Sequence, residues 1–165
     1  MSDTQNLINK TREYLDYVQE HYNNVQRAWK VVKDKCSDMR VVWDGWFFHI
    51  LNCEIKYHDA SKLSAEEFTQ YRDAFFPVAE KKPLGNAWEH HKKCNDHHWE
   101  TWTNKKYAKP IEWQIHCTHM VIDWMAMGYK FGDTAQEFYE KNKDKIKIPD
   151  YAVKFIYEIF DRIRE

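Results

Sequence analysis

Only four glycines and four prolines occur in the 165 residues, and this scarcity of turn-forming residues constrains the fold more than any other feature. β-Sandwiches and barrels need a turn roughly every 8–12 residues, and such turns depend on glycine or proline. The long stretches between these few residues instead carry apolar side chains three and four positions apart, which is the spacing of a helix face. The sequence therefore predicts an all-α fold.

The clearest helical pattern runs from Leu7 to Lys33. Its apolar residues form one stripe: Leu15, Val18, Tyr22, Val25, Trp29 and Val32. His21 falls inside this stripe, so we expect it to face the core. A second helix is predicted from Met39 to Tyr57, a segment rich in large apolar residues, and it places the pair His58–Asp59 at or just after its C-terminus.

Turn and capping signals mark the remaining helices. The sequence Ser64-Ala65-Glu66-Glu67 resembles a capping box that opens a helix from Ala65 to Phe76, and Pro77–Gly85 is the predicted loop. Further helices are predicted over Asn86–Cys94 (ended by Asn95-Asp96), Pro110–Tyr129 (opened by Pro110, closed near Gly132), Thr134–Lys143 (capped by Thr134) and from Pro149-Asp150 to near the C-terminus. We expect one compact, single-domain bundle of about six to seven helices over residues 1–165.

Charge and composition exclude several classes of protein. The 25 lysines and arginines nearly balance the 26 aspartates and glutamates, so general nucleic-acid binding is not expected. No long apolar run predicts a membrane helix, and the polar start does not resemble a signal peptide. The four cysteines are far apart and predict reduced, mostly buried thiols: Cys36, Cys53, Cys94 and Cys117. We expect a cytoplasmic protein, and its aromatic content would permit a homodimer.

Residues 58–62 read His-Asp-Ala-Ser-Lys, and the adjacent pair His58–Asp59 is the first candidate metal-binding element. The pair offers an imidazole and a carboxylate from neighbouring positions, a combination that suits Mn, Fe, Co, Ni or Zn. Nine histidines in the chain supply further candidate ligands. A histidine excess of this kind indicates metal or proton chemistry.

A second candidate element lies in the helix that follows Pro110. Glu112, His116, His119 and Asp123 are four, three and four residues apart, which keeps them on one helix face. A solvated polar face is an alternative interpretation for Glu112 and His116. Asp123 lies among apolar neighbours, so we expect it in a buried stretch, where a carboxylate needs a partner or a metal ion.

The third element is a cluster of four histidines: His90, His91, His97 and His98. Adjacent histidines point about 100° apart on a helix, so at most one of each pair faces a common site. Seven residues separate His91 from His98, which keeps both on one face if the helix continues. We favour His91 and His98, with His97 as the alternative to His98.

The order of these residues resembles the ligand pattern of the HD-domain superfamily, and Lys62 matches the lysine of its His-Asp-x-x-Lys signature. The chain is also similar to small uncharacterised bacterial and phage proteins with an HD-like motif and an Asn-x-His-His segment. The resemblance implies an HD-like helical bundle. It implies a first metal ion on His21, His58, Asp59 and Asp123, and a second on His91 and His98 (or His97) with Asp59 bridging. His119 could replace a histidine of the third cluster, and His49 competes with His21.

The resemblance further implies a metal-dependent phosphohydrolase acting on a small nucleotide or other phosphoester through one or two divalent ions. Asp59 and Lys62 would serve catalysis, Lys62 would also contact a substrate phosphate, and His119 is a candidate to orient water or protonate the leaving group. Trp88 is a candidate to stack on a base, although most tryptophans are expected in the core. The segment after His98 lacks the Gly-Tyr-Pro run of the cyclic-dinucleotide hydrolases, so that subclass is not expected.

Three alternatives stay open. One is a di-iron oxygenase of the same superfamily, which uses the same ligand pattern. Another is a non-catalytic module that binds a nucleotide or a protein partner. The last is a plain helical bundle in which the histidines are core and surface residues without a metal ion.

Overall fold

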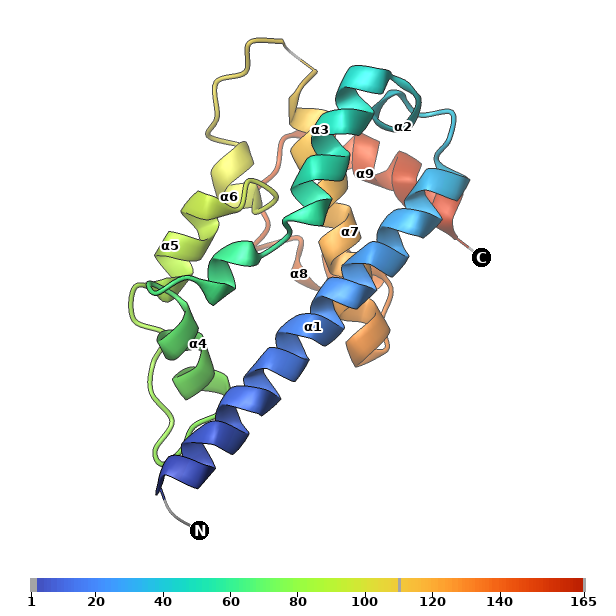
Figure 1. Ribbon diagram of the computed structural model, residues 1–165. Coiled ribbons are helices and arrows are strands. Elements are labelled where there is room, and N and C mark those ends of the chain that lie inside the picture. The colour runs from blue at the N-terminus through green and yellow to red at the C-terminus, as the bar shows by residue number, and fades with distance from the viewer. Residues whose placement is uncertain (1–2, 110, 165) are drawn as a thin grey trace. The chain divides into compact units, whose positions relative to one another are not determined.

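The computed structural model describes residues 3–109 and 111–164 (Figure 1). Within these ranges the chain forms α-helices and one short 3-10 helix but no strand, which confirms the all-α class. In chain order the helices are α1 (Asp3–Lys35), α2 (Arg40–Trp43), α3 (Gly45–Lys56), η1 (Ala60–Leu63), α4 (Phe68–Phe75), α5 (Ala87–Cys94), α6 (Trp99–Trp102), α7 (Trp113–Phe131), α8 (Ala135–Asn142) and α9 (Asp150–Ile163).

Helix α1 is continuous over 33 residues. Its second half brings three residues of the predicted stripe into the core: Val25, Trp29 and Val32. His21 is also buried, which confirms that it faces inward. Leu15, by contrast, is 43% exposed, and the neighbouring Tyr14 is fully buried in its place. The Tyr14 hydroxyl donates to the carbonyl oxygen of Lys62 at 2.9 Å. Helical periodicity cannot predict this contact, because the two residues are far apart in the sequence.

The predicted helix from Met39 to Tyr57 is divided into α2 and α3 at Asp44. Asp44 has an extended backbone (φ −73°, ψ 117°), and its side chain accepts hydrogen bonds from the N–H groups of Trp46 at 3.0 Å and Phe47 at 3.4 Å. The Asp44 side chain thus satisfies the first N–H groups of α3, which would otherwise bond to carbonyl oxygens of a continuing α2. The break was not predicted because apolar residues continue on both sides of it.

Replacing Asp44 by alanine should destabilise the protein by about 1 kcal/mol, because the start of α3 loses its side-chain acceptor. Urea unfolding followed by circular dichroism measures this loss. Asp44→Asn retains an acceptor oxygen and should lose less. An equal loss in both variants would instead assign the effect to the ion pair between Arg40 and Asp44.

The segment after Asp59 also differs from prediction. It begins with the 3-10 helix η1, and α4 starts at Phe68 rather than at Ala65. The capping box expected from Ser64 to Glu67 is wrong, since Glu67 precedes α4 without a side-chain capping bond. Its carboxylate is fully buried and bonds to imidazoles of α5 instead. Glu67 therefore bonds to histidines distant in the sequence and not to the backbone N–H groups at the start of its own helix.

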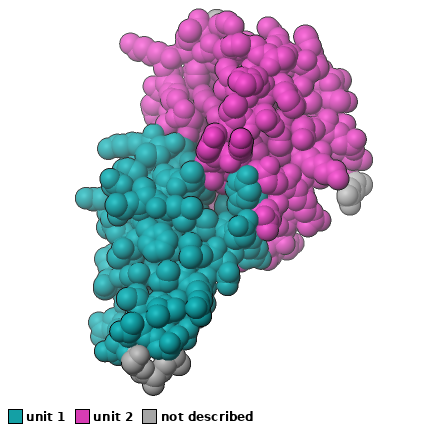
Figure 2. All heavy atoms as spheres, in the orientation of Figure 1, with its two compact units in different colours: residues 1–22, 59–95 teal, residues 23–58, 96–165 magenta. Residues whose placement is uncertain are grey.

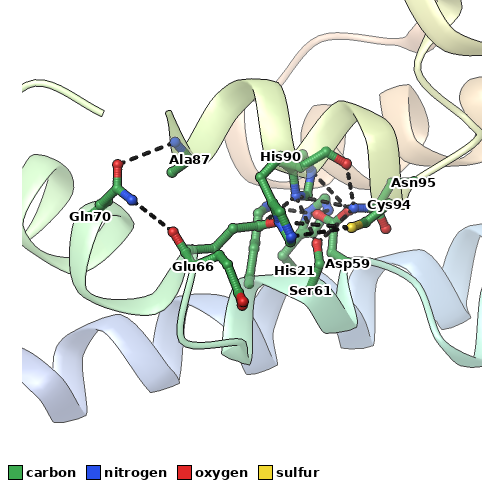
Figure 3. Close-up of polar contacts among 12 residues, drawn as sticks. His21, Asp59, Ser61, Glu66, Gln70, Ala87, His90, Cys94 and Asn95 are labelled. Carbon is green, nitrogen blue, oxygen red and sulfur yellow. Dashed lines mark hydrogen bonds and ion pairs between the residues drawn. The ribbon is translucent and has the colours of Figure 1, made fainter. Parts of the chain in front are cut away.

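Gln70 of α4 holds the start of α5, the helix predicted over residues 86–94. Its Oε1 accepts from the N–H of Ala87 at 3.2 Å, and its Nε2 donates to the carbonyl oxygen of Glu66 at 2.7 Å (Figure 3). These two bonds fix the first turn of α5 against the segment that precedes α4. The orientation of the histidines on α5 follows from this attachment.

Helix α5 ends at Cys94, as the sequence predicts. Asn95 is extended (φ −124°, ψ 100°), and its side-chain Nδ2 donates to the carbonyl oxygen of His91 at 2.8 Å. The helix therefore does not continue to His98, and the seven-residue spacing no longer places His91 and His98 on one face. His98 instead lies directly before α6.

The C-terminal part follows the sequence closely. Helix α7 ends at Gly132, whose φ of 86° lies in the left-handed region that glycine favours. Thr134 caps α8 as predicted, and it forms a capping box with Glu137, in which the Thr134 hydroxyl accepts from the Glu137 N–H at 3.1 Å. Helix α9 begins after Pro149, as expected. Pro110, predicted to open the helix that became α7, lies outside the described residues.

Two compact units make up the chain (Figure 2). Unit 1 comprises the residues up to Tyr22 together with Asp59–Asn95, and its small aromatic core includes Tyr14, Tyr71 and Ala87. Unit 2 comprises Asn23–His58 and the chain from Asp96 onward, and its larger core includes the buried face of α7. The single domain expected over residues 1–165 stays a prediction.

The four cysteines are free, and only part of their expected burial is observed. Cys36 and Cys117 are buried, whereas Cys53 and Cys94 are exposed. Burial raises the pKa of the Cys36 thiol to about 11. None of the helices described here is both long enough and apolar enough to span a membrane.

Candidate metal centres

Asp59 stands at the start of η1 with an unusual backbone. Its φ of 55° and ψ of 19° lie in the left-handed region, and no other non-glycine residue among those described has a positive φ. Aspartate tolerates this conformation better than most residues, but it is still uncommon. Such a conformation is a frequent property of functional sites, where the surrounding structure holds it in place.

The Asp59 carboxylate is surrounded by buried basic side chains of unit 1. His91 Nε2 lies 3.2 Å from Oδ1, and His21 Nε2 lies 3.7 Å from Oδ2. Lys62 Nζ donates to Oδ2 at 2.7 Å. Figure 3 shows Asp59 and His21 converging from η1 and α1. We call His21, Asp59 and His91 the Asp59 group; each side chain is less than a tenth exposed.

Glu67, which the sequence did not single out as a site residue, orients the histidines of α5. Its Oε2 accepts from His91 Nδ1 at 2.9 Å and its Oε1 accepts from His90 Nδ1 at 2.7 Å. Because Nδ1 of His91 then carries the proton, its Nε2 presents a lone pair toward Asp59. Two acceptors 3.2 Å apart repel one another unless a proton or a metal ion lies between them. A carboxylate behind a ligating histidine is the usual outer partner of a metal site.

Unit 2 contains a second group of buried imidazoles around His58. His58 Nδ1 lies 2.9 Å from His119 Nε2, and His58 Nε2 lies 3.5 Å from Asp123 Oδ1. His119 and Asp123 are one turn apart on α7, as their spacing predicts. The ring of His97 packs against His58 and His119, with ring centroids 4.6 and 4.5 Å apart. We call His58, His97, His119 and Asp123 the His58 group.

Glu54, on α3, was also missed by the sequence. Its Oε2 accepts from His119 Nδ1 at 3.3 Å and from His116 Nδ1 at 3.2 Å. Burial alone would raise the pKa of Glu54, but hydrogen bonds from His116 and His119, with the charge that these rings carry when protonated, lower it to about 2. Burial lowers the pKa of His119 even though Glu54 acts in the opposite direction. The lowered pKa of Glu54 favours its ionised form, and the lowered pKa of His119 favours its neutral form.

The other residues considered in the sequence analysis have the following surroundings. His98 packs on His97, with ring centroids 4.4 Å apart, and Trp88 is 37% exposed while its ring stacks on His91 at 5.9 Å. His49 is exposed, which agrees with the preference for His21. The alternative of a solvated face does not hold for His116, which is buried. Glu112 accepts from the N–H of Ala108 at 3.1 Å.

The division of the chain falls between His58 and Asp59, so the six predicted ligands are shared between the two units. His21, Asp59 and His91 belong to unit 1, whereas His58, His98 and Asp123 belong to unit 2. In unit 2, ligand atoms of His58, His97 and His119 lie within 4.8 Å of one another. Imidazole nitrogen combined with carboxylate oxygen suits Mn, Fe, Co, Ni or Zn, so the side chains in both units fit a divalent ion.

Comparison with known proteins gives a family but no activity. No curated protein and no solved structure matches the chain. The matching family model is DUF5662, and it covers residues 10–162, which include every candidate ligand. This match assigns no HD domain. The chain belongs to DUF5662, a family of unknown function.

Proposed function

We propose that the protein is a metal-dependent phosphohydrolase of the HD type that acts on a small nucleotide or another phosphoester. The observation that carries the proposal is the Asp59 group, in which one buried carboxylate faces an imidazole Nε2 on each of its oxygens. Glu67 fixes the tautomer of His91 that a ligand requires. An aspartate flanked in this way is suited to bind a divalent ion.

The order of residues along the chain supports the finer assignment. His21, the adjacent pair His58–Asp59, the histidines of residues 91–98 and Asp123 follow the sequence pattern of the HD superfamily. Lys62 occupies the lysine position of the His-Asp-x-x-Lys signature and lies beside Asp59 at 2.7 Å. The phosphoester class of substrate rests on this resemblance.

A bound divalent ion would supply positive charge and lower the pKa of a water molecule, which suits hydrolysis of a phosphoester. Lys62 would neutralise negative charge that develops on the phosphoryl oxygens. His21 and His91, whose Nε2 atoms face the two oxygens of the Asp59 carboxylate, would bind the ion together with it. The exposed part of Trp88, whose ring stacks on His91, offers a surface for a nucleobase.

The first test is the metal content of protein purified without an affinity tag or chelator, measured by mass spectrometry. We expect at least one divalent ion per chain in the wild type and one ion fewer in His91→Gln. His49→Gln changes an exposed histidine outside both groups and should retain the metal. Wild-type protein that holds no metal, even after reloading with each of the five ions, would contradict the proposal.

The same three proteins are then assayed for phosphate release from a panel of nucleotides and simple phosphoesters. We expect hydrolysis by the wild type and by His49→Gln, and a loss of at least about 100-fold in His91→Gln, as for removal of a metal-site residue. Metal-loaded protein that releases no phosphate from any substrate would refute the hydrolase assignment but leave metal binding intact. Bound iron with oxygen consumption would point to the oxygenase instead.

A further inference from the structure

We propose that Glu54 and His119 form a hydrogen-bonded relay that fixes the tautomer of His58, so that His58 binds a divalent ion through Nε2 together with Asp123. This inference rests on the proposed function, because it assigns positioning residues for the same metal chemistry. It changes the expected role of His119 from a group that handles protons of the reaction to one that orients a ligand. It lies entirely within unit 2.

The relay starts at the Glu54 carboxylate, which can only accept hydrogen bonds when ionised. His119 Nδ1 lies 3.3 Å from its Oε2, so the Nδ1 position of His119 carries the proton. A neutral imidazole has one N–H, and His119 Nε2 must then be an acceptor. His58 Nδ1 lies 2.9 Å from His119 Nε2, an ordinary hydrogen-bond distance, so His58 Nδ1 is the donor.

This assignment leaves a lone pair on His58 Nε2, which lies 3.5 Å from Asp123 Oδ1. A charge-assisted hydrogen bond would be shorter, at about 2.7–2.9 Å. The separation instead fits two ligands of one ion, since metal–nitrogen and metal–oxygen bonds of about 2.0–2.2 Å place neighbouring ligand atoms roughly 3 Å or more apart. The His58 side chain is fully buried, so water does not compete for this nitrogen.

The competing arrangement uses the same residues differently. If His58 carried its proton on Nε2 and donated to Asp123, then His58 Nδ1 and His119 Nε2 would both be free to bind an ion beside His97. The ligand atoms of these three histidines are close enough for this alternative. The two arrangements require opposite tautomers of His58, and a tautomer is measurable without any metal.

The test is the tautomeric state of His58 in ¹⁵N-labelled, metal-free protein, read from two-bond ¹H–¹⁵N correlations at neutral pH. We expect the Nδ1–H form in the wild type. His119→Leu removes the acceptor and should convert His58 partly or wholly to the Nε2–H form. His119→Gln keeps an acceptor oxygen and should restore the Nδ1–H form, which a purely structural role of His119 would not explain.

Metal titration of the same variants gives the second readout. We expect binding through His58 to weaken about 10- to 100-fold in His119→Leu, with recovery in His119→Gln. An Nε2–H form in the wild type, or an unchanged tautomer in His119→Leu, would overturn the relay and favour the alternative with His97. If His119→Leu does not fold, Glu54→Leu is measured in its place. Without the Glu54 carboxylate the proton of His119 is no longer fixed on Nδ1, so the Nδ1–H form of His58 should become less populated. If His58 is found in the Nδ1–H form but the protein binds no metal, the hydrogen-bonded relay stands and the proposed function is refuted.

Discussion

Adding a divalent ion at about one hundred times its dissociation constant should raise the free energy of unfolding by about 2.7 kcal/mol, because the ion binds the folded protein and not the unfolded chain. The gain arises because folding brings His21, Asp59 and His91 together from segments far apart in the sequence. Urea unfolding of chelator-treated protein, with and without Mn, Fe, Co, Ni or Zn, measures it.

Asp59→Ala removes the carboxylate that faces both histidines and should lose this stabilisation. A gain that survives in Asp59→Ala but disappears in Asp123→Ala would come from the His58 group instead. Asp73→Ala serves as the matched control, since it removes another buried carboxylate of unit 1 that pairs with Arg72 and Lys82. Wild-type protein that gains no stability with any of the five ions would contradict metal binding at either group.

Lys62→Met is expected to destabilise the metal-free protein by about 3–5 kcal/mol, because it removes the cation of a buried ion pair and leaves a buried carboxylate. Lys62 Nζ lies 2.7 Å from Asp59 Oδ2, and both side chains are nearly buried. The chain offers a matched comparison in Lys82, which lies 2.8 Å from Asp73 but is 68% exposed. Lys82→Met should cost less than about 1 kcal/mol, because solvent screens an exposed pair.

Both variants are measured by urea unfolding without metal and again with the ion that binds the wild type. Because a divalent ion at Asp59 supplies the missing positive charge, it should reduce the deficit of Lys62→Met and leave that of Lys82→Met unchanged. Similar losses in the two variants would mean that the burial of Lys62 contributes little. A deficit in Lys62→Met that the ion does not reduce would mean that Lys62 and the ion do not share Asp59.

The helices were predictable wherever a local signal marks them. The apolar stripe of α1, the capping box at Thr134 and the glycine after α7 all act through neighbouring residues, so they are present in the sequence itself. The two incorrect helix predictions, the unbroken helix through Asp44 and the capping box ending at Glu67, share a cause. Asp44 interrupts a continuous apolar segment, and Glu67 accepts hydrogen bonds from histidines of α5 where a bond within its own helix start was expected. In both places one polar side chain outweighs the pattern around it.

The candidate ligands were predictable as residue types but not as a network. Histidine and aspartate are rare enough in buried helices for their spacing to be informative. The ligand set of His21, His58, Asp59, His91 and Asp123 came from the resemblance of that spacing to the HD-domain pattern. Glutamate is common on solvent-exposed helices, so nothing in the sequence marks Glu54 or Glu67 as partners of histidines. His98 was favoured over His97 on the condition that the helix continues past Cys94, and the structure ends that helix at Cys94.

The sequence by itself therefore determined the all-α class, most helix boundaries and the histidines and aspartates that are proposed as metal ligands. These properties depend on periodicity, capping and residue type, which act over a few residues. The tertiary structure decided which nitrogen of each histidine faces a carboxylate, because the glutamates that bond to His91 and His119 come from other segments. Hydrogen bonds between residues 24 and 65 positions apart exist only in the folded chain.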